Sequence, residues 1–206
     1  PDTDEISPDL KTLIIVHPKQ LSNETLYAID QFLLRGGRLM VFVDPLSAAD
    51  ARMSASQNPM NMGANNSSNL EKLFSAWGVD FSSDKVVADP RLFTRIQGAE
   101  GLEDSLVWLS LREPGFNSEE VITSQLDLMV LPSAGHFTIT DNKEGLEPTT
   151  LMTSSEDAGV VSPRAAQMGS GMIQREFKRK GSALDLAMKI DRTFSTAFPE
   201  GPPSPE

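Results

Sequence analysis

The chain has 206 residues, 39% of them hydrophobic, which is enough to bury the core of one large domain or of a domain with an appended subdomain. Its formal charge of -11 argues against binding to nucleic acid and against electrostatic docking on anionic lipid, because like charges repel. The sequence contains no cysteine, so disulfides, thiolate catalysis and cysteine metal sites are excluded.

The sequence also carries no recognisable membrane or targeting segment. No apolar stretch approaches the roughly 20 residues that span a bilayer, and no signal peptide is present. The chain begins with Pro1 rather than methionine. We therefore expect it to be a soluble piece cut from a longer protein.

Residues 12–45 predict one βαβ unit of a parallel sheet, around which we expect the rest of the chain to be arranged. The apolar residues 13–16 lack polar alternation, as is typical of a strand covered on both faces by helices. Ser22 can cap a helix that ends at the glycines 36–37, and residues 39–43 form a second apolar strand. The helix carries apolar residues at spacings of three and four: Leu26, Ile29, Phe32 and Leu33.

A polar residue follows each of these strands, His17 after the first and Asp44 after the second. A parallel crossover is right-handed in almost every known case, so the carboxyl ends of both strands meet at one edge of the sheet. We therefore expect His17 and Asp44 to lie close together, at the edge where open α/β folds bind ligands.

The next segment predicts a long loop, a helix and a third strand. Residues 46–68 lack periodicity, and loops of that length are often functional or mobile. Residues 70–77 place their large apolar side chains on one helix face, and the mostly apolar residues 85–88 form a strand ended by Asp89-Pro90. This alternation of strand and helix indicates a doubly wound sheet.

The second half of the chain predicts strands with little helix between them, at 106–111, 126–131, 136–140 and 149–152. Such an order indicates a mixed or antiparallel extension of the sheet. We also expect a short helix at 119–125, an exposed excursion at 162–175, an edge strand within 183–198 and a flexible Pro-rich tail at 199–206. The prediction is a single three-layer α/β domain over residues 1–198, with a mainly parallel core at 10–90 and a β-rich extension at 91–198.

Candidate ligand or partner contacts are four polar residues, His17, Lys19, Asp44 and Asp89, and the loop methionines Met53, Met60 and Met62. A histidine oriented by a carboxylate can act as a general base or bind a metal, and Lys19 can meet an anion at the start of the helix. The alternative is structural, because His-Pro and Asp-Pro pairs commonly end strands and cap nearby backbone. The methionines can contact a partner or can simply cover the sheet edge.

Other motifs give no support for catalysis. The chain has no G-x-S-x-G elbow for a nucleophilic serine, and no glycine-rich loop follows the first strand to bind phosphate. His136 stands alone, and the SSED cluster at 154–157 is more typical of a solvated turn than of a cation site. We therefore expect no catalytic residue, no metal and no cofactor.

Several segments resemble the extracytoplasmic domain of ABC-type transport auxiliary proteins of the gliding-motility (GldG-like) group: HPKQLSNETLYAIDQFLLRGGRLMVFVDP, NLEKLFSAWGV, KVVADP, PTTLMTSSEDAG and TAFPEGPP. The resemblance covers most of residues 10–203. It implies a flavodoxin-like or glutamine-amidotransferase-like domain without established catalysis. That domain would stand on the periplasmic, extracytoplasmic side of the inner membrane, beside an ABC-2 type permease and its ATPase. The flanking transmembrane helices of the family are missing here, so membrane attachment would run through segments outside this chain.

We therefore expect a non-catalytic module that binds or scaffolds partner proteins, or an extracytoplasmic polymer such as carbohydrate, through the loop at the carboxyl edge. Two alternatives stay open. One is a hydrolase or carbohydrate-acting enzyme that uses His17 and Asp44, and the other is a sensor of a small ligand.

Overall fold

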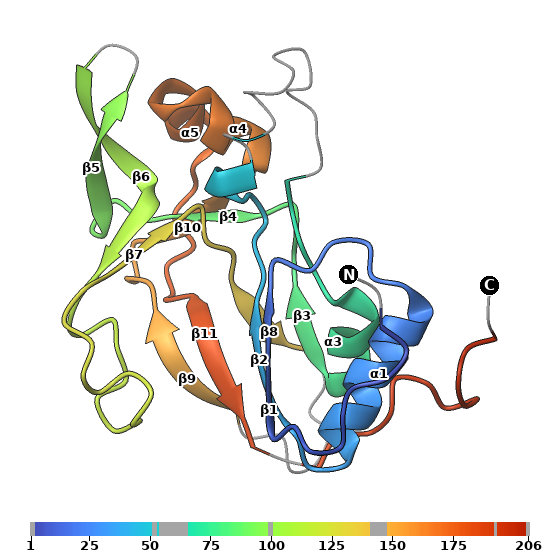
Figure 1. Ribbon diagram of the computed structural model, residues 1–206. Helices are drawn as coiled ribbons and strands as arrows, with labels where there is room; N and C mark the ends of the chain where they lie inside the picture. The colour runs from blue at the N-terminus through green and yellow to red at the C-terminus, as the bar shows by residue number, and fades with distance from the viewer. Residues whose placement is uncertain are drawn as a thin grey trace.

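The computed structural model describes residues 3–50, 53, 66–98, 101–140, 148–191 and 193–204. Its labelled elements follow in chain order: β1 (Thr12–Val16), α1 (Asn23–Leu34), β2 (Arg38–Phe42), α3 (Glu71–Trp77), β3 (Val79–Phe81), β4 (Val86–Ala88), β5 (Phe93–Gly98), β6 (Gly101–Leu111), β7 (Met129–Pro132), β8 (Phe137–Ile139), β9 (Pro148–Thr153), β10 (Gly159–Val161), α4 (Pro163–Met168), α5 (Ser170–Glu176) and β11 (Asp185–Ile190). Figure 1 shows α1 and α3 beside β1 and β2, with α4 and α5 at the opposite end near the β5–β6 hairpin. Within the described ranges, no helix combines the length and apolar character that a membrane crossing requires.

The predicted βαβ unit is present. β1 and β2 pair in parallel, with Ile14 opposite Met40. Between them, α1 begins at the predicted cap, where the Ser22 hydroxyl accepts a hydrogen bond from the backbone N–H of Thr25 at 3.2 Å. After the helix, Gly36 turns the chain with a φ of 89°, a conformation that glycine adopts at little steric cost.

The prediction of a mainly parallel, flavodoxin-like or glutamine-amidotransferase-like sheet is wrong. The parallel sheet contains only β1 and β2, and the other sheets that the structure describes are antiparallel. Their strand orders are β3-β8-β11-β9, β4-β10 and β5-β6-β7. The protein is therefore a mixed α/β fold built from small sheets, most of them antiparallel.

The third predicted strand shows why the parallel assignment failed. β4 is fully buried, as its apolar run predicts, but Val87 lies opposite Val160 in an antiparallel pair with β10. An apolar run records burial on both faces and does not fix the direction of the partner strand. In addition, Gly78 adopts a left-handed φ of 76° and leads α3 directly into β3, which pairs with β8 rather than with β2.

Other parts of the second half also differ from the prediction. The expected exposed excursion at 162–175 forms α4 and α5, because Ser162 caps the first helix and Pro163 starts it with a suitable φ. β11 is a strand as predicted, but it lies between β8 and β9 rather than at an edge. Residues 119–125 form turns instead of a helix, and β5 was not predicted.

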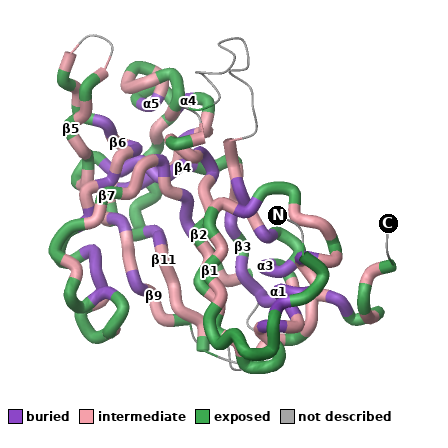
Figure 2. Tube along the Cα trace, in the orientation of Figure 1, coloured by how far each residue is buried: buried purple, intermediate pink, exposed green. Residues whose placement is uncertain are grey.

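The buried hydrophobic side chains of the described ranges form three clusters. Figure 2 marks the buried residues along the chain in purple. The first cluster packs α1 and α3 against the inner face of β1 and β2 and against β3, with Phe32 completely buried. The second joins α4 and α5 to β4 and β6, through buried residues that include Ala165 and Ile173. The division into a core at 10–90 and an extension at 91–198 stays a prediction.

A buried carboxylate fastens the C-terminal segment to α1. Asp30 is fully buried, and its side chain accepts hydrogen bonds from the Thr196 hydroxyl at 2.6 Å and from the Ala197 backbone N–H at 3.0 Å. The next residue, Phe198, packs edge-on against Tyr27 with ring centroids 5.3 Å apart. The Lys72 ammonium lies 3.8 Å from the Phe198 ring centroid, so this aromatic ring is held from two sides.

We expect Asp30→Ala to lower the free energy of unfolding by about 2 kcal/mol, because it leaves partly buried donors on Thr196 and Ala197 without their acceptor. Urea denaturation followed by circular dichroism measures this change. Asp9→Ala, at an exposed position, serves as the control and is expected to change stability by less than about 0.5 kcal/mol. Equal effects of the two substitutions would contradict the anchoring role of Asp30.

Candidate functional site

The carboxyl edge of β1 and β2 carries a network of charged side chains. Nδ1 of His17 lies 3.1 Å from Oδ2 of Asp44, as the parallel crossover predicts. Nε2 of the same ring lies 3.2 Å from Oδ2 of Asp50, which also binds the ammonium of Lys19. These four residues, His17, Lys19, Asp44 and Asp50, are called the edge network below.

The backbone around His17 is held in an uncommon conformation. The His17 N–H donates to the carbonyl of Phe42 at 2.9 Å, so the strand pairing continues up to the site. His17 itself has a φ of 51° and Gln20 a φ of 48°, both in the left-handed region. Such a conformation costs about 1–2 kcal/mol per residue. Strain of this kind clusters at functional sites, so the conformation of His17 marks this turn as a candidate.

Hydrogen bonds at the base of the long loop hold the two aspartates of the edge network. The Asp44 N–H donates to the Ser68 hydroxyl at 2.9 Å, and the Ser68 N–H donates back to the Asp44 carbonyl at 2.8 Å. The Asp50 N–H donates to the Ser47 hydroxyl at 3.3 Å, and residues 48–50 are helical. The Ser47 N–H donates to the carbonyl of Asn66 at 2.8 Å, which brings the two ends of the loop together.

The contacts of His17 limit what the ring can do chemically. A neutral imidazole has one donor nitrogen and one acceptor nitrogen, whereas an ionised carboxylate only accepts. Each ring nitrogen of His17 faces a carboxylate, Nδ1 that of Asp44 and Nε2 that of Asp50. In this arrangement both nitrogens are engaged within the protein, and neither is free to contact a substrate.

The Lys19 ammonium donates a hydrogen bond to Asp50 and so lowers the pKa of that carboxyl below its ordinary value. The hydrogen bond from His17 acts in the same direction, while partial desolvation of the carboxyl opposes both. Asp50 is therefore ionised throughout the neutral pH range.

Asp50 was not among the residues selected from the sequence. The signal for it was the S-x-x-D spacing of Ser47 and Asp50, a capping-box pattern that predicts the start of a helical turn. Of the loop methionines, Met53 is 60% exposed, whereas Met60 and Met62 lie outside the described residues. The roles of Lys19 and the methionines in partner binding stay predictions.

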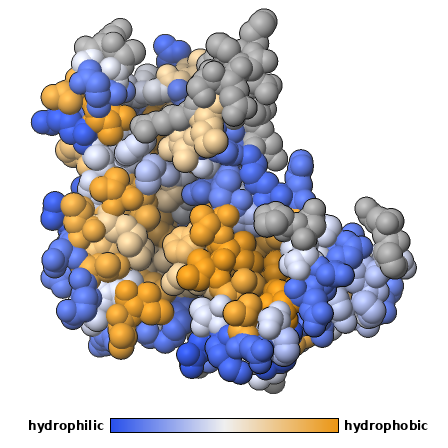
Figure 3. All heavy atoms as spheres, viewed as in Figure 1, coloured by the Kyte–Doolittle hydropathy of each residue, from blue (hydrophilic) through white to orange (hydrophobic). Residues whose placement is uncertain are grey.

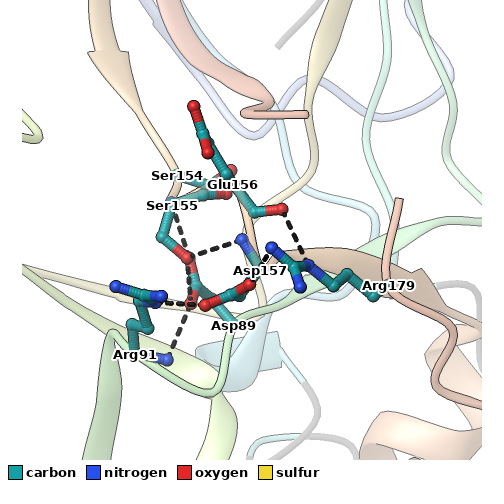
Figure 4. Close-up of polar contacts among 7 residues, drawn as sticks. All are labelled: Asp89, Arg91, Ser154, Ser155, Glu156, Asp157 and Arg179. Atoms are coloured by element: carbon teal, nitrogen blue, oxygen red, sulfur yellow. Dashed lines mark hydrogen bonds and ion pairs between the residues drawn. The ribbon is translucent and has the colours of Figure 1, made fainter. Parts of the chain in front are cut away.

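Asp89 does not join the edge network and lies in a separate, buried one (Figure 4). It is fully buried, and its carboxylate accepts three hydrogen bonds, all from 2.7 to 2.8 Å long. The donors are the backbone N–H groups of Arg91 and Ser155 and the hydroxyl of Ser155. This arrangement is the structural role that an Asp-Pro strand end commonly has, and it connects β4 to the turn at 154–157.

The same turn is more ordered than a simple solvated turn. Asp157 forms ion pairs with Arg91 and Arg179, and these three residues surround the Asp89 contacts in Figure 4. The hydrogen bond from Arg91 is the main reason that the pKa of Asp157 is lowered, and Arg179 adds to the effect. Ser154 is buried, and its hydroxyl accepts from the Leu184 N–H at 2.8 Å.

His136 also lies away from the edge network. Its ring is largely buried, and Nδ1 has no hydrogen-bond partner among the described residues. Burial lowers the pKa of this imidazole, and the positive charges of Lys180 and Lys85 act in the same direction. His136 is thus placed as a neutral core residue. In the described ranges, no group of three or more His, Asp or Glu residues is arranged to hold a metal ion.

A shallow hollow lies near the base of the long loop. It has a volume of about 220 Å³ and is lined by Pro45, Leu46, Asn66, Ser67, Ser83, Asp84, Pro163 and Gln167. Sites for small ligands usually measure about 300–1,000 Å³. The geometry of this region therefore favours contact with a larger partner over enclosure of a small molecule.

Residues 1–206 match the family model ABC_transp_aux, described as "ABC-type uncharacterized transport system". The chain belongs to this family. It is accordingly an auxiliary component of an ABC-type transport system, as the motifs between His17 and Pro203 indicated. No curated protein and no solved structure matches the chain.

We expect Asp89→Ala to lower the free energy of unfolding of this auxiliary component by about 3 kcal/mol, because three hydrogen bonds to a fully buried carboxylate are lost. Chemical denaturation monitored by tryptophan fluorescence measures the loss. Asp104→Ala is the matched control, since its ion pair with Arg95 is exposed and screened by solvent, so its loss is expected to change stability little. A change for Asp89→Ala as small as that of the control would contradict a structural role for Asp89.

The lowered pKa of Asp50 predicts a pH-dependent contribution to stability. A depressed folded-state pKa stabilises the protein above the ordinary value of 3.8, and this contribution is lost as the pH falls through the lower folded-state value. We expect Asp50→Asn to lower the free energy of unfolding by less than about 1 kcal/mol at neutral pH, because the pair is partly exposed. The difference from wild type should shrink as the pH falls below 3.8.

Urea titrations of both proteins across the acidic range measure this trend. Lys19→Met removes the main cause of the shift and is expected to lose stability in the same pH window. A difference between Asp50→Asn and wild type that stays constant with pH would contradict the assignment.

Proposed function

We propose that the domain is a non-catalytic binding module of its transport system, with the edge network as the contact. In this proposal the module faces the periplasmic, extracytoplasmic side of the inner membrane, to which segments outside this chain attach it. It stands beside an ABC-2 type permease and its ATPase, in a system of the gliding-motility type. Its partner is one of these proteins or an extracytoplasmic polymer such as carbohydrate.

The observation that carries the proposal is the engagement of both His17 nitrogens by carboxylates, Asp44 on one side and Asp50 on the other. The ring is held in position from both sides, and each nitrogen is in contact with a carboxylate of the protein itself. A catalytic base needs a nitrogen within reach of a substrate proton, whereas a recognition surface needs charges held in a fixed arrangement.

The charges of the edge network are also accessible to a partner. The side chains of Asp44 and Lys19 are 36% and 37% exposed, and the His17 side chain is 17% exposed. Partly exposed charges at a fixed spacing contribute mainly to the specificity and the association rate of a complex. The loop at 46–68, whose ends are joined by hydrogen bonds, borders the same edge.

The 3.1 Å contact between His17 and Asp44 also keeps a hydrolase or carbohydrate-acting enzyme as a second candidate. In such an enzyme Asp44 would orient the ring and Nε2 would act on a substrate, but Asp50 occupies that nitrogen. A screen of glycoside and ester substrates, with wild type compared with His17→Ala, tests this candidate. Turnover that disappears in His17→Ala would replace the binding function by an enzymatic one.

We expect Asp44→Lys to reduce retention of the permease by about tenfold or more, because it places a repulsive charge beside His17 and Lys19. The measurement is co-purification of the full-length protein with the permease and the ATPase of its own transport system from detergent-solubilised membranes. Quantitative immunoblots give the retained fraction.

Arg95→Glu is the matched control, since it reverses one charge in an exposed ion pair on the β5–β6 hairpin, remote in the chain from the edge network. It is expected to leave retention unchanged. If Asp44→Lys retains as much permease as Arg95→Glu and both proteins are folded by circular dichroism, the edge network is not the contact.

A further inference from the structure

One face of the β1–β2 sheet is apolar and open to solvent. The outer side chains are Ile14 and Val16 on β1 and Met40 and Phe42 on β2, which are 59%, 68%, 42% and 50% exposed. The register places Ile14 opposite Met40 and Val16 opposite Phe42, so the four side chains form one contiguous patch. Figure 3 shows hydrophobic side chains gathered over β1 and β2 in the middle of this face. We call these four residues the open face.

The opposite face of the same two strands is covered. Leu13, Ile15, Leu39 and Val41 pack against the hydrophobic cluster that contains α1 and α3. Parallel strands are normally covered on both faces, because neither face of an apolar run is stable in water. Contiguous exposed apolar patches of this kind commonly mark binding sites for other proteins. The open face therefore lacks the second layer that its sequence predicts.

The dimensions of the open face match those of one helix. Each strand has five residues and is about 16 Å long at roughly 3.3 Å per residue. A helix of about 11 residues, or three turns, has that length and a diameter of about 10 Å, which two neighbouring strands can support. A stripe of apolar residues at spacings of three and four would cover the four side chains.

Charges at the two ends of the open face set the orientation of such a helix. At the amino ends of the strands, Lys11 and Arg38 are exposed, and neither side chain has an ion pair with a described residue. Arg38 lies on the same side of β2 as Met40. The carboxyl ends carry the edge network, in which His17 and Lys19 already face Asp44 and Asp50, so that end has no uncompensated charge of one sign. A complementary helix therefore carries acidic residues over Arg38.

We propose that the open face binds an amphipathic α-helix of a partner protein, with acidic residues at the end that lies over Arg38. The inference rests on the proposed function for the source of the helix, a protein of the transport complex. A second copy of this chain is the less favoured occupant, because each copy carries a net charge of -11.

The experiment places a photo-crosslinking amino acid at position 40 of the full-length protein in cells that contain the complete transport system. We expect an adduct that maps by mass spectrometry to a partner segment with apolar residues at spacings of three and four and an acidic residue at one end. Arg38→Glu is expected to reduce the adduct by about tenfold, and exchange of the acidic partner residue for lysine is expected to restore it.

The crosslinker at position 121 is the control, because Val121 is 88% exposed but lies in a turn outside the open face. It is expected to give no adduct with the same segment. Circular dichroism of each variant confirms folding, which these exposed positions should not disturb. The inference is overturned if position 40 gives no adduct, if its adduct is a second copy of this chain, or if the charge exchange fails to restore the adduct.

The outcome also separates this inference from the proposed function. An adduct that passes the charge-exchange test but belongs to a protein outside the transport complex supports the helix site and contradicts the proposed source of the partner. The variant Asp44→Lys can also lose permease retention while it still forms the position-40 adduct. That result supports the edge network as the permease contact and shows that the edge network and the open face act separately.

Discussion

The parallel pairing of β1 with β2 is the constraint on which the site depends. Because both strands run in the same direction, their carboxyl ends meet and His17 lies 3.1 Å from Asp44. The same crossover places α1 on one face of the pair and leaves the other face to be covered by something else. The edge network and the open face are therefore two results of one local topology.

Two buried carboxylates connect parts of the chain that are far apart in sequence. Asp30 binds Thr196 and Ala197, more than 160 positions away, and Asp89 binds Ser155, 66 positions away. Each is satisfied by several donors, which offsets the cost of removing its charge from water. The small sheets are thus joined by polar anchors as well as by the three hydrophobic clusters.

The sequence predicted the local elements better than their partners. The βαβ unit, the Ser22 cap and the proximity of His17 to Asp44 follow from short-range patterns and from the handedness of crossovers. The antiparallel partner of β4 and the central place of β11 depend on contacts between distant segments, which an apolar run does not encode. For α4 and α5, the start signal at Ser162-Pro163 was present, but glycines at 169 and 171 suggested a loop instead.

In the candidate site, the sequence identified three of the four members of the edge network. Asp50 was missed because it lies inside a segment without periodicity, where only the S-x-x-D spacing gave a signal. Asp89 was grouped with His17 because both follow apolar strands, but β4 belongs to a different sheet from β1. Ile14 and Val16 were expected to be covered, and their exposure instead reveals the open face.

The attachment of residues 196–198 to α1 has a mechanical consequence. Tension applied along the C-terminal segment reaches Asp30, Tyr27 and Lys72 before it reaches any strand. Because α1 packs on the covered face of β1 and β2, a force applied to this segment acts on the helix that contacts both strands. Movement of residues 196–198 is therefore coupled through α1 to the packing of β1 and β2.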